Sequence, residues 1–221
     1  MLKLIIVMIM KNIDNKTYQK YIKRLVEGDR RSCFDIVQSL IEKDIELEII
    51  YKELFTKSMY EIGYLWQKNK ITVTVEHIAT SITEQLISSL YPKILGSGQN
   101  KACKYLGACV PGELHQLGGK MIADLMELYG WDSFFAGANT PEEDLLQEIK
   151  RIRPDLIGLS ISIFFNFDKM KNLIKSIQSS FPDLKIITGG HAFTLTDNNI
   201  LSDFKNVRLI KDIDELKRLS C

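Results

Sequence analysis

The chain has 221 residues, enough for one large domain or two small ones that each bury a core. Hydrophobic residues make up 45% and charged residues 26%, the ordinary balance of a soluble globular protein. The 29 Lys and Arg residues nearly match the 28 Asp and Glu residues, and the formal net charge is +1. Because phosphate binding usually needs a basic excess on one face, this balance argues against nucleic acid as the main partner.

The cysteines and the first residues of the chain indicate in which cellular compartment the protein is expected. The cysteines at positions 33, 103, 109 and 221 form no CxxC pair, so we expect neither a zinc site nor a disulfide framework, in a cytoplasmic protein. Within residues 1–12, the stretch Met1–Met10 is apolar apart from one lysine, but it is too short to span a bilayer and has no cleavage signal. We expect a disordered or loosely packed leader, with Met10 as an alternative start.

The first hundred residues are predicted to be helical. Apolar residues recur at three- and four-residue spacing from Ile22 to Ile41, and Gly28-Asp29 separates two helices, with Asp29 as a candidate N-cap. A third helix is predicted at about 47–66 and a fourth at about 72–95. Four helices with short connections predict a four-helix bundle over residues 13–97, and Gly96 to Asn100 then form a linker.

The second half alternates between strand and helix patterns. Five apolar runs are predicted as strands: Tyr105–Val110, Ser133–Ala136, Leu156–Ser162, Lys185–Thr188 and Val207–Ile210. Helical patterns lie between them, at His115–Tyr129, Glu142–Arg151, Phe167–Ser180 and Asp197–Leu201. This alternation predicts an α/β domain over residues 101–221, a doubly wound, five-stranded parallel sheet of the Rossmann-like, flavodoxin-like kind. Ligands bind such sheets at the carboxyl ends of the strands, near the switch in strand order.

The loop after the first predicted strand carries the pattern Glu113-x-His115-x-x-Gly118. It matches neither the P-loop nor the GxGxxG pattern, so phosphate binding is not its obvious purpose. A His at a strand end can bind a metal through one ring nitrogen while a nearby carboxylate fixes the proton on the other. A helix-capping Glu and a partly exposed His with no ligand fit the same residues.

Two later strand ends carry small and polar residues. The third strand ends with Ser160 and Ser162, and the fourth is followed by Gly189 and Gly190. A serine at a buried strand end needs a hydrogen-bond partner, and paired glycines let a bulky ligand approach the backbone closely. Each signal alone is weak, because Gly-Gly after a strand is more often a tight turn.

Together with the Glu113-x-His115-x-x-Gly118 loop, these strand ends resemble the B12-binding domain family, over about residues 101–212. The resemblance implies that His115 replaces the cofactor's own dimethylbenzimidazole as the lower cobalt ligand, with Glu113 as its partner where many members have Asp. It also implies that Ser160 contacts the detached base and that Gly118, Ser162, Gly189 and Gly190 belong to the groove for the nucleotide tail. Ser162 departs from the aliphatic residue often found there.

The helical half is similar to the cap that precedes such domains. Trp66 followed by Glu76-His77 resembles a pattern of B12-dependent light sensors of the CarH type, in which these residues contact the upper face of adenosylcobalamin. A flat indole packs on a corrin or nucleoside, and Glu and His can hydrogen-bond ribose hydroxyls. Trp66 as a core residue and Glu76-His77 as a surface pair remain the alternative. Gln67 stands where some sensors have a second cobalt-binding His, and we expect no helix-turn-helix domain before the cap.

Two functions fit this sequence. The first is a cobalamin sensor or regulator, with adenosylcobalamin favoured over methylcobalamin and with output through a separate protein. Light, cobalamin level and redox state remain open as its signal. The second is a corrinoid shuttle protein that presents methyl-cobalt to a methyltransferase. No Ser/His/Asp order, paired-carboxylate site or second cofactor motif indicates an enzyme. Direct nucleic-acid and membrane binding are not expected, whereas self-association is compatible with either role.

Overall fold

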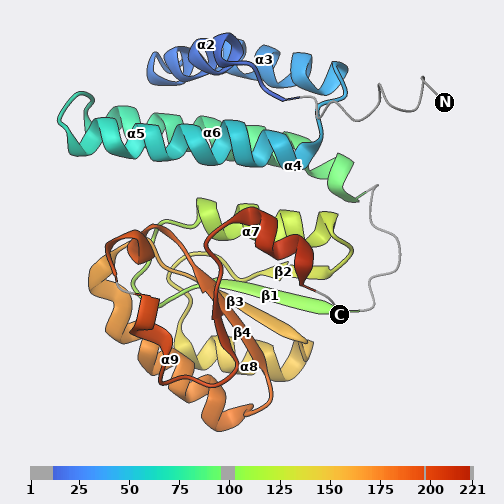
Figure 1. Cartoon of the computed structure of the whole chain (residues 1–221), viewed down its shortest axis with the longest axis vertical. Helices are drawn as coiled ribbons and strands as arrows, with labels where there is room; N and C mark the ends of the chain where they lie inside the picture. Colours follow the sequence, from blue (N-terminus) through green and yellow to red (C-terminus); the bar gives the residue numbers. More distant parts are fainter. Residues whose placement is uncertain (1–11, 96–102, 197, 220–221) are drawn as a thin grey trace. The chain divides into compact units, whose positions relative to one another are not determined.

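The computed structural model describes residues 12–95, 103–196 and 198–219 (Figure 1). The chain divides into two compact units, Met1–Leu90 and Tyr91–Cys221, which are described separately below. The predicted linker and the predicted leader up to residue 11 lie outside the described residues.

The first unit is helical, as predicted. Its helices are α2 (Asn15–Val26), α3 (Arg30–Glu42), the continuous run of α4 (Leu47–Ile49), η2 (Ile50–Thr56) and α5 (Lys57–Gln67), and most of α6 (Val73–Leu95). Asp14 and Asp29 cap the first two helices by accepting hydrogen bonds from the backbone N–H groups of Thr17 and Ser32, at 2.9 and 3.1 Å. The predicted cap at Asp29 is therefore confirmed.

The third helix contains a feature that its sequence pattern does not predict. The segment η2 is a π-helix of seven residues. Ile50, Tyr51, Leu54 and Phe55 are all fully buried there, and the rings of Tyr51 and Phe55 meet edge to face with centroids 5.6 Å apart. A π-helix has wider turns than an α-helix, so it changes which side chains of the following segment face the core. Spacings of three and four residues describe both helix types too coarsely to separate them.

The second unit is built on a parallel sheet in the order β2-β1-β3-β4-β5, which confirms the predicted α/β fold (Figure 1). The strands are β1 (Lys104–Cys109), β2 (Asp132–Phe135), β3 (Leu156–Ser160), β4 (Lys185–Gly189) and β5 (Val207–Leu209). The helices are α7 (Leu117–Leu128), α8 (Glu142–Ile152) and α9 (Phe167–Ser180), with short 3₁₀ segments η3 (Phe164–Asn166), η4 (His191–Leu195), η5 (Asn198–Leu201) and η6 (Ile213–Arg218). The strand order switches between β1 and β3, where parallel sheets bind ligands.

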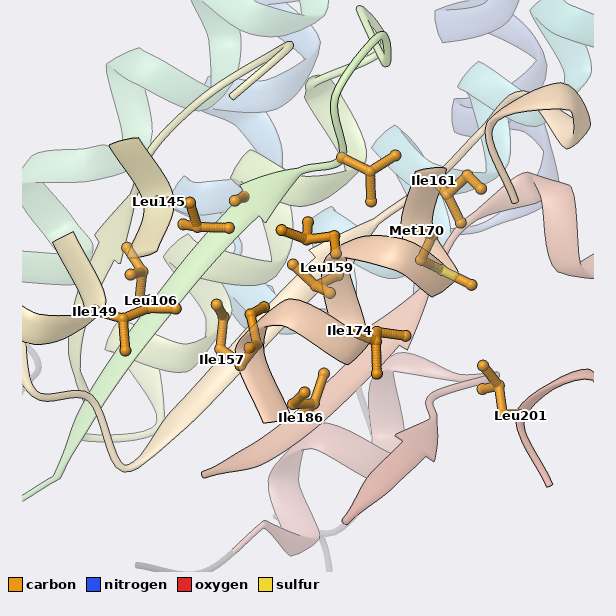
Figure 2. Packing of buried hydrophobic residues seen from close by; sticks show 14 of the residues in the cluster. Leu106, Leu145, Ile149, Ile157, Leu159, Ile161, Met170, Ile174, Ile186 and Leu201 are labelled. Carbon is orange, nitrogen blue, oxygen red and sulfur yellow. The ribbon is translucent and has the colours of Figure 1, made fainter. Parts of the chain in front are cut away.

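One face of this sheet is covered by α8 and α9. Side chains from alternate positions of β1, β3 and β4 form a buried cluster with both helices (Figure 2). Leu106, Ile157 and Ile186 come from the strands, and Ile149 and Ile174 come from the helices (Figure 2). Because side chains alternate along a strand, the intervening residues face the other side of the sheet.

That other face lies under α7. A side-chain carbon added at Gly119 of α7 would lie 2.9 Å from the Phe135 ring and 3.3 Å from Cβ of Ser160. The register pairs Gly107 with Gly158, Cys109 with Ser160, and Ser160 with Gly189. Cys109, Ser160 and Gly189 therefore form a row of small residues under α7, close to the carboxyl ends of the central strands. In the next row, Gly107 and Gly158 lie between Phe135 and Ile187.

Three further points concern the sequence predictions. Cys103 is disulfide-bonded, whereas no disulfide was expected from the cysteine spacing, and Cys33 and Cys109 are free. The segment η6, which the pattern did not predict, contributes the fully buried Leu216. Within the described ranges, no helix is long and apolar enough to cross a membrane.

Candidate functional site

The loop between β1 and α7 brings Glu113 and His115 together. The Glu113 side chain is completely buried, whereas that of His115 is 58% exposed. Oε1 of Glu113 lies 2.6 Å from Nδ1 of His115 and also accepts a hydrogen bond from the His115 backbone N–H at 3.0 Å. With an ionised carboxylate at this distance, Nδ1 carries the ring proton. Nε2 then holds the lone pair that can bind a metal.

The second carboxylate oxygen of Glu113 joins this loop to the end of β3. Oε2 accepts hydrogen bonds from the backbone N–H groups of Ser162 and Ile163, at 2.8 and 2.9 Å. Burial alone would raise the pKa of the Glu113 carboxyl, but the hydrogen bonds that it accepts outweigh burial and lower the pKa from 4.5 to about 2. The carboxylate therefore stays ionised at neutral pH and orients the imidazole.

Two asparagines hold the same loop from neighbouring elements. Asn166 is buried, and its Nδ2 lies 3.3 Å from Oε2 of Glu113 and 3.4 Å from the carbonyl oxygen of Gly112. Asn139 accepts a hydrogen bond from the Gly112 N–H at 2.7 Å, and its own N–H donates to the Glu113 carbonyl at 2.8 Å. The loop that carries His115 is thus fixed from both sides before any ligand binds.

The predicted groove residues differ in their surroundings. A side-chain carbon at Gly118 would meet nothing within 4 Å, so there is open space beside the first turn of α7. Ser160 is half-buried and faces α7, and its hydroxyl makes no hydrogen bond to any residue that the structure describes. Ser162 contributes its backbone N–H to Glu113 rather than a side-chain contact.

The paired glycines have structural reasons of their own. A side-chain carbon at Gly190, where φ is +122°, would lie 2.2 Å from the carbonyl oxygen of Ile161. One at Gly189 would lie 3.0 Å from the carbonyl oxygen of Ile210. Gly190 therefore needs glycine for packing of the strand ends, whether or not a ligand passes beside it, whereas a side chain at Gly189 would require the Ile210 carbonyl to shift slightly.

Exposed apolar side chains lie in the loops after β1, β3 and β4, at the same edge of the sheet as His115. They are Leu114, Ile163, Phe164, Phe165 and Leu195, with exposed fractions from 40% to 89%. Together with the protruding imidazole, they offer an apolar platform at the carboxyl edge of the sheet. An exposed imidazole on an apolar platform can bind a flat macrocycle that brings its own metal. No cluster of three His, Cys, Asp or Glu side chains is found among the described residues.

In the helical unit, the predicted residues lie at the α5–α6 connection. Trp66 is 44% exposed and is therefore not the core residue that the alternative reading required. Glu76 and His77 lie in the first turns of α6, where Oε2 of Glu76 is 3.5 Å from Nε2 of His77. Oε1 of Glu76 accepts a hydrogen bond from Thr80 at 3.0 Å. Tyr60 and Tyr64 of α5 are also exposed, and a side-chain carbon at Gly63 between them would meet nothing within 4 Å.

Sequence reasoning missed several residues of the site. Asn166 lies 53 positions from Glu113, and no local pattern links the two. Phe164 and Phe165 could have been noticed in the sequence, because two adjacent aromatic residues in the loop after a predicted strand end are candidates for ligand contact. Tyr105 was read only as part of a strand, although its ring lies against the glycines under α7.

Comparison with known proteins finds a B12 binding domain in each unit. Residues 17–91 and residues 103–207 each match a B12 binding domain. The two matches together cover most of the chain, and they fall on the helical unit and on the sheet unit, respectively.

The curated relatives are of two kinds. The chain is 25% identical over 144 residues to the HTH-type transcriptional repressor CarH of Myxococcus xanthus, which covers 64% of this chain and 47% of the repressor. It therefore spans about half the length of that relative. It is 20% identical to a corrinoid protein of Desulfitobacterium hafniense, over 75% of this chain and 79% of that protein. A dimethylamine corrinoid protein of Methanosarcina acetivorans is 21% identical, over 71% and 76%.

Solved structures share the fold. The monomethylamine corrinoid protein of Methanosarcina barkeri superposes with a TM-score of 0.79 at 13% identity, covering 93% of this chain and 97% of that one. The methanol:cobalamin methyltransferase complex MtaBC of Methanosarcina barkeri gives a TM-score of 0.50 at 13% identity, covering 94% and 79%. The predicted combination of helical cap and five-stranded parallel domain is confirmed.

Proposed function

Because the chain belongs to the B12-binding family, we propose that His115 binds the cobalt of cobalamin from below, in place of the cofactor's own base. Binding of a corrinoid follows from the family itself, and the relatives are named as corrinoid proteins or as a repressor, which agrees with the prediction that the chain is not an enzyme. The observation that carries the proposal is the 2.6 Å contact between Glu113 and Nδ1 of His115, which directs Nε2 to a metal.

The residues present fit this cofactor. The His115 ring is exposed at the sheet edge that also carries the exposed apolar side chains, and the open space beside Gly118 and the half-buried Ser160 hydroxyl lie on the α7 side of the same edge. A displaced nucleotide base would enter between α7 and the small residues of β1, β3 and β4. The cobalt supplies redox and alkyl-carrying chemistry when the cofactor is bound.

Lower ligation can be tested with a corrinoid that has no base of its own. Wild-type protein loaded with cob(II)inamide should show nitrogen superhyperfine splitting in its electron paramagnetic resonance spectrum, since only the protein can supply the nitrogen. His115→Ala should lose this splitting. His191→Ala, which removes the other histidine of the sheet unit, should keep it. Splitting that persists in His115→Ala would show that another group ligates the cobalt.

For the biological role, we propose a cobalamin sensor or regulator that holds adenosylcobalamin and signals through a separate protein, with light as one candidate signal beside cobalamin level and redox state. Its support is that Trp66 and His77 are both exposed near the α5–α6 connection, where His77 pairs with Glu76. In this role Trp66 contacts the adenosyl group, and the weak cobalt–carbon bond makes that group releasable by light. Release of the adenosyl group would then alter the surface around Trp66.

The second candidate is a corrinoid carrier that presents methyl-cobalt to a methyltransferase. It is favoured by the extent of the matches, because the chain aligns with 76% to 79% of two relatives named as corrinoid proteins. A carrier needs an upper face that another enzyme can reach, and it has no use for selective contact with an adenosyl group.

The two roles predict different effects of Trp66→Ala. For a sensor, the variant should lose affinity for adenosylcobalamin at least several-fold more than for methylcobalamin, as measured by equilibrium titration in the dark. Phe34→Ala serves as a control, because Phe34 is equally exposed at 43% on α3. Equal losses for the two cofactors in Trp66→Ala would favour the carrier.

A further inference from the structure

Tyr105 lies on the face of the sheet that α7 covers, in line with the predicted base groove. The register places Tyr105, Gly107 and Cys109 on this face of β1, with Gly158 and Ser160 beside them on β3. Ser160 and Gly189 form the row nearest the carboxyl edge, and Gly107 and Gly158 form the next row inward. Two residues of strand separate the rows, which is roughly 6.5 Å.

The tyrosine ring extends along β1 toward the carboxyl edge and ends over the glycines of the inner row. A side-chain carbon at Gly158 would lie 1.9 Å from the Tyr105 hydroxyl oxygen, and one at Gly107 would lie 3.1 Å from it. Gly158 could not become alanine without moving this ring. The two glycines therefore make room for the hydroxyl, which lies one row below Ser160.

The hydroxyl is a neutral polar group in a row that otherwise holds the two glycines and the apolar residues Phe135 and Ile187. Tyr105 is only 2% exposed, and burial raises the pKa of its phenol, so that the O–H keeps its proton and can both donate and accept. Neighbouring Cys109 is also a neutral thiol, because burial and the charge of Glu113 raise its pKa to about 12. The hydroxyl makes no hydrogen bond within the described part of the chain, although buried polar groups usually have a partner.

Resting on the proposed function, we propose that Tyr105 forms the floor of the base groove and selects the corrinoid's lower base. A base entering past Ser160 and Gly189 meets the Tyr105 hydroxyl with its distal edge. A distal hydroxyl, as in 5-hydroxybenzimidazole, gains a hydrogen bond there. The two methyl groups of dimethylbenzimidazole place apolar atoms against the hydroxyl instead. The preferred corrinoid is thus one with a hydrogen-bonding group on the distal edge of its base.

The test compares three corrinoids by equilibrium titration of the full chain: cobinamide, which has no base, cobalamin, and the cobamide with 5-hydroxybenzimidazole. Wild-type protein should bind the hydroxylated cobamide about fivefold more tightly than cobalamin, because a hydrogen bond that contributes about 1 kcal/mol lowers the Kd by about this factor. Tyr105→Phe should abolish this preference and leave cobinamide affinity unchanged. Tyr129→Phe, which removes a hydroxyl just after α7, should keep the preference.

Thermal unfolding of apo Tyr105→Phe should match wild type, since phenylalanine fills the same space. A wild-type protein that binds both base-carrying corrinoids equally, or a Tyr105→Phe variant that keeps the preference, would overturn the proposal while leaving corrinoid binding intact. Failure of wild-type protein to bind any of the three, cobinamide included, would instead remove the proposed function and this inference with it.

Discussion

At the scale of single residues, Glu113 has two tasks that its sequence position shows only in part. The spacing to His115 predicts the contact with the imidazole. The other oxygen binds Ser162, Ile163 and Asn166, about fifty residues along the chain, and only the parallel pairing of β1 with β3 brings these groups together. A buried, ionised carboxylate with several donors is a strong determinant of local structure, because removing its charge leaves those donors poorly matched.

We therefore expect Glu113→Gln to destabilise the apo protein by roughly 2–3 kcal/mol at pH 7, measured by urea unfolding. The pKa of Glu113 is about 2 in the folded protein and 4.5 ordinarily, so its contribution is complete above about pH 4.5 and falls as the pH drops toward 2. The difference between wild type and variant should shrink accordingly between pH 5 and pH 3. Glu148→Gln, at an exposed pair with Arg151, should change stability little. A constant difference across this range would show that Glu113 is not ionised in the fold.

At the scale of elements, helices and strands were predicted well from the sequence where the pattern of buried apolar residues is clear. The continuous apolar strands and the amphipathic helix α9, with the predicted bounds Phe167–Ser180, follow from burial patterns alone. The π-helical segment and η6 could not be predicted in this way, because packing against distant residues decides both. The orientation of Tyr105 depends likewise on Gly158, which lies 53 positions away on a neighbouring strand.

Helix α7 allows stability and binding to be separated. Gly118→Ala should stabilise the apo protein by up to about 1 kcal/mol, because alanine favours helix and no atom lies within 4 Å of the new carbon. The same carbon should weaken cobalamin binding several-fold, since it occupies space that we assign to the nucleotide tail. Gly119→Ala, one residue later, should destabilise the protein, because its carbon meets Phe135 at 2.9 Å. Thermal unfolding and cobalamin titration measure the two effects. If Gly118→Ala binds cobalamin as tightly as wild type, the nucleotide tail of the cofactor does not pass beside Gly118.

At the scale of the whole molecule, each of the two units contains a B12 binding domain. Residues 17–91 and 103–207 both match B12 binding domains, and neither match includes a DNA-binding element. The repressor relative aligns over only 47% of its length, so its name does not transfer DNA binding to the part that this chain matches. The net charge of the chain is then the property from which DNA binding can be predicted, since non-specific DNA affinity is largely electrostatic.

We expect the chain to bind no DNA by itself, whether apo or loaded with adenosylcobalamin, in the dark or after illumination. With 29 basic and 28 acidic residues, it lacks the cationic excess that gives ordinary DNA-binding proteins non-specific dissociation constants of about 10⁻⁴–10⁻⁶ M at physiological salt. Fluorescence anisotropy of a labelled duplex should therefore stay flat as the protein concentration rises through this range. Saturable binding that depends on the duplex sequence would contradict the prediction and would indicate a basic surface built from a minority of the lysines and arginines. A flat titration in all four states means that any effect on transcription passes through a second protein.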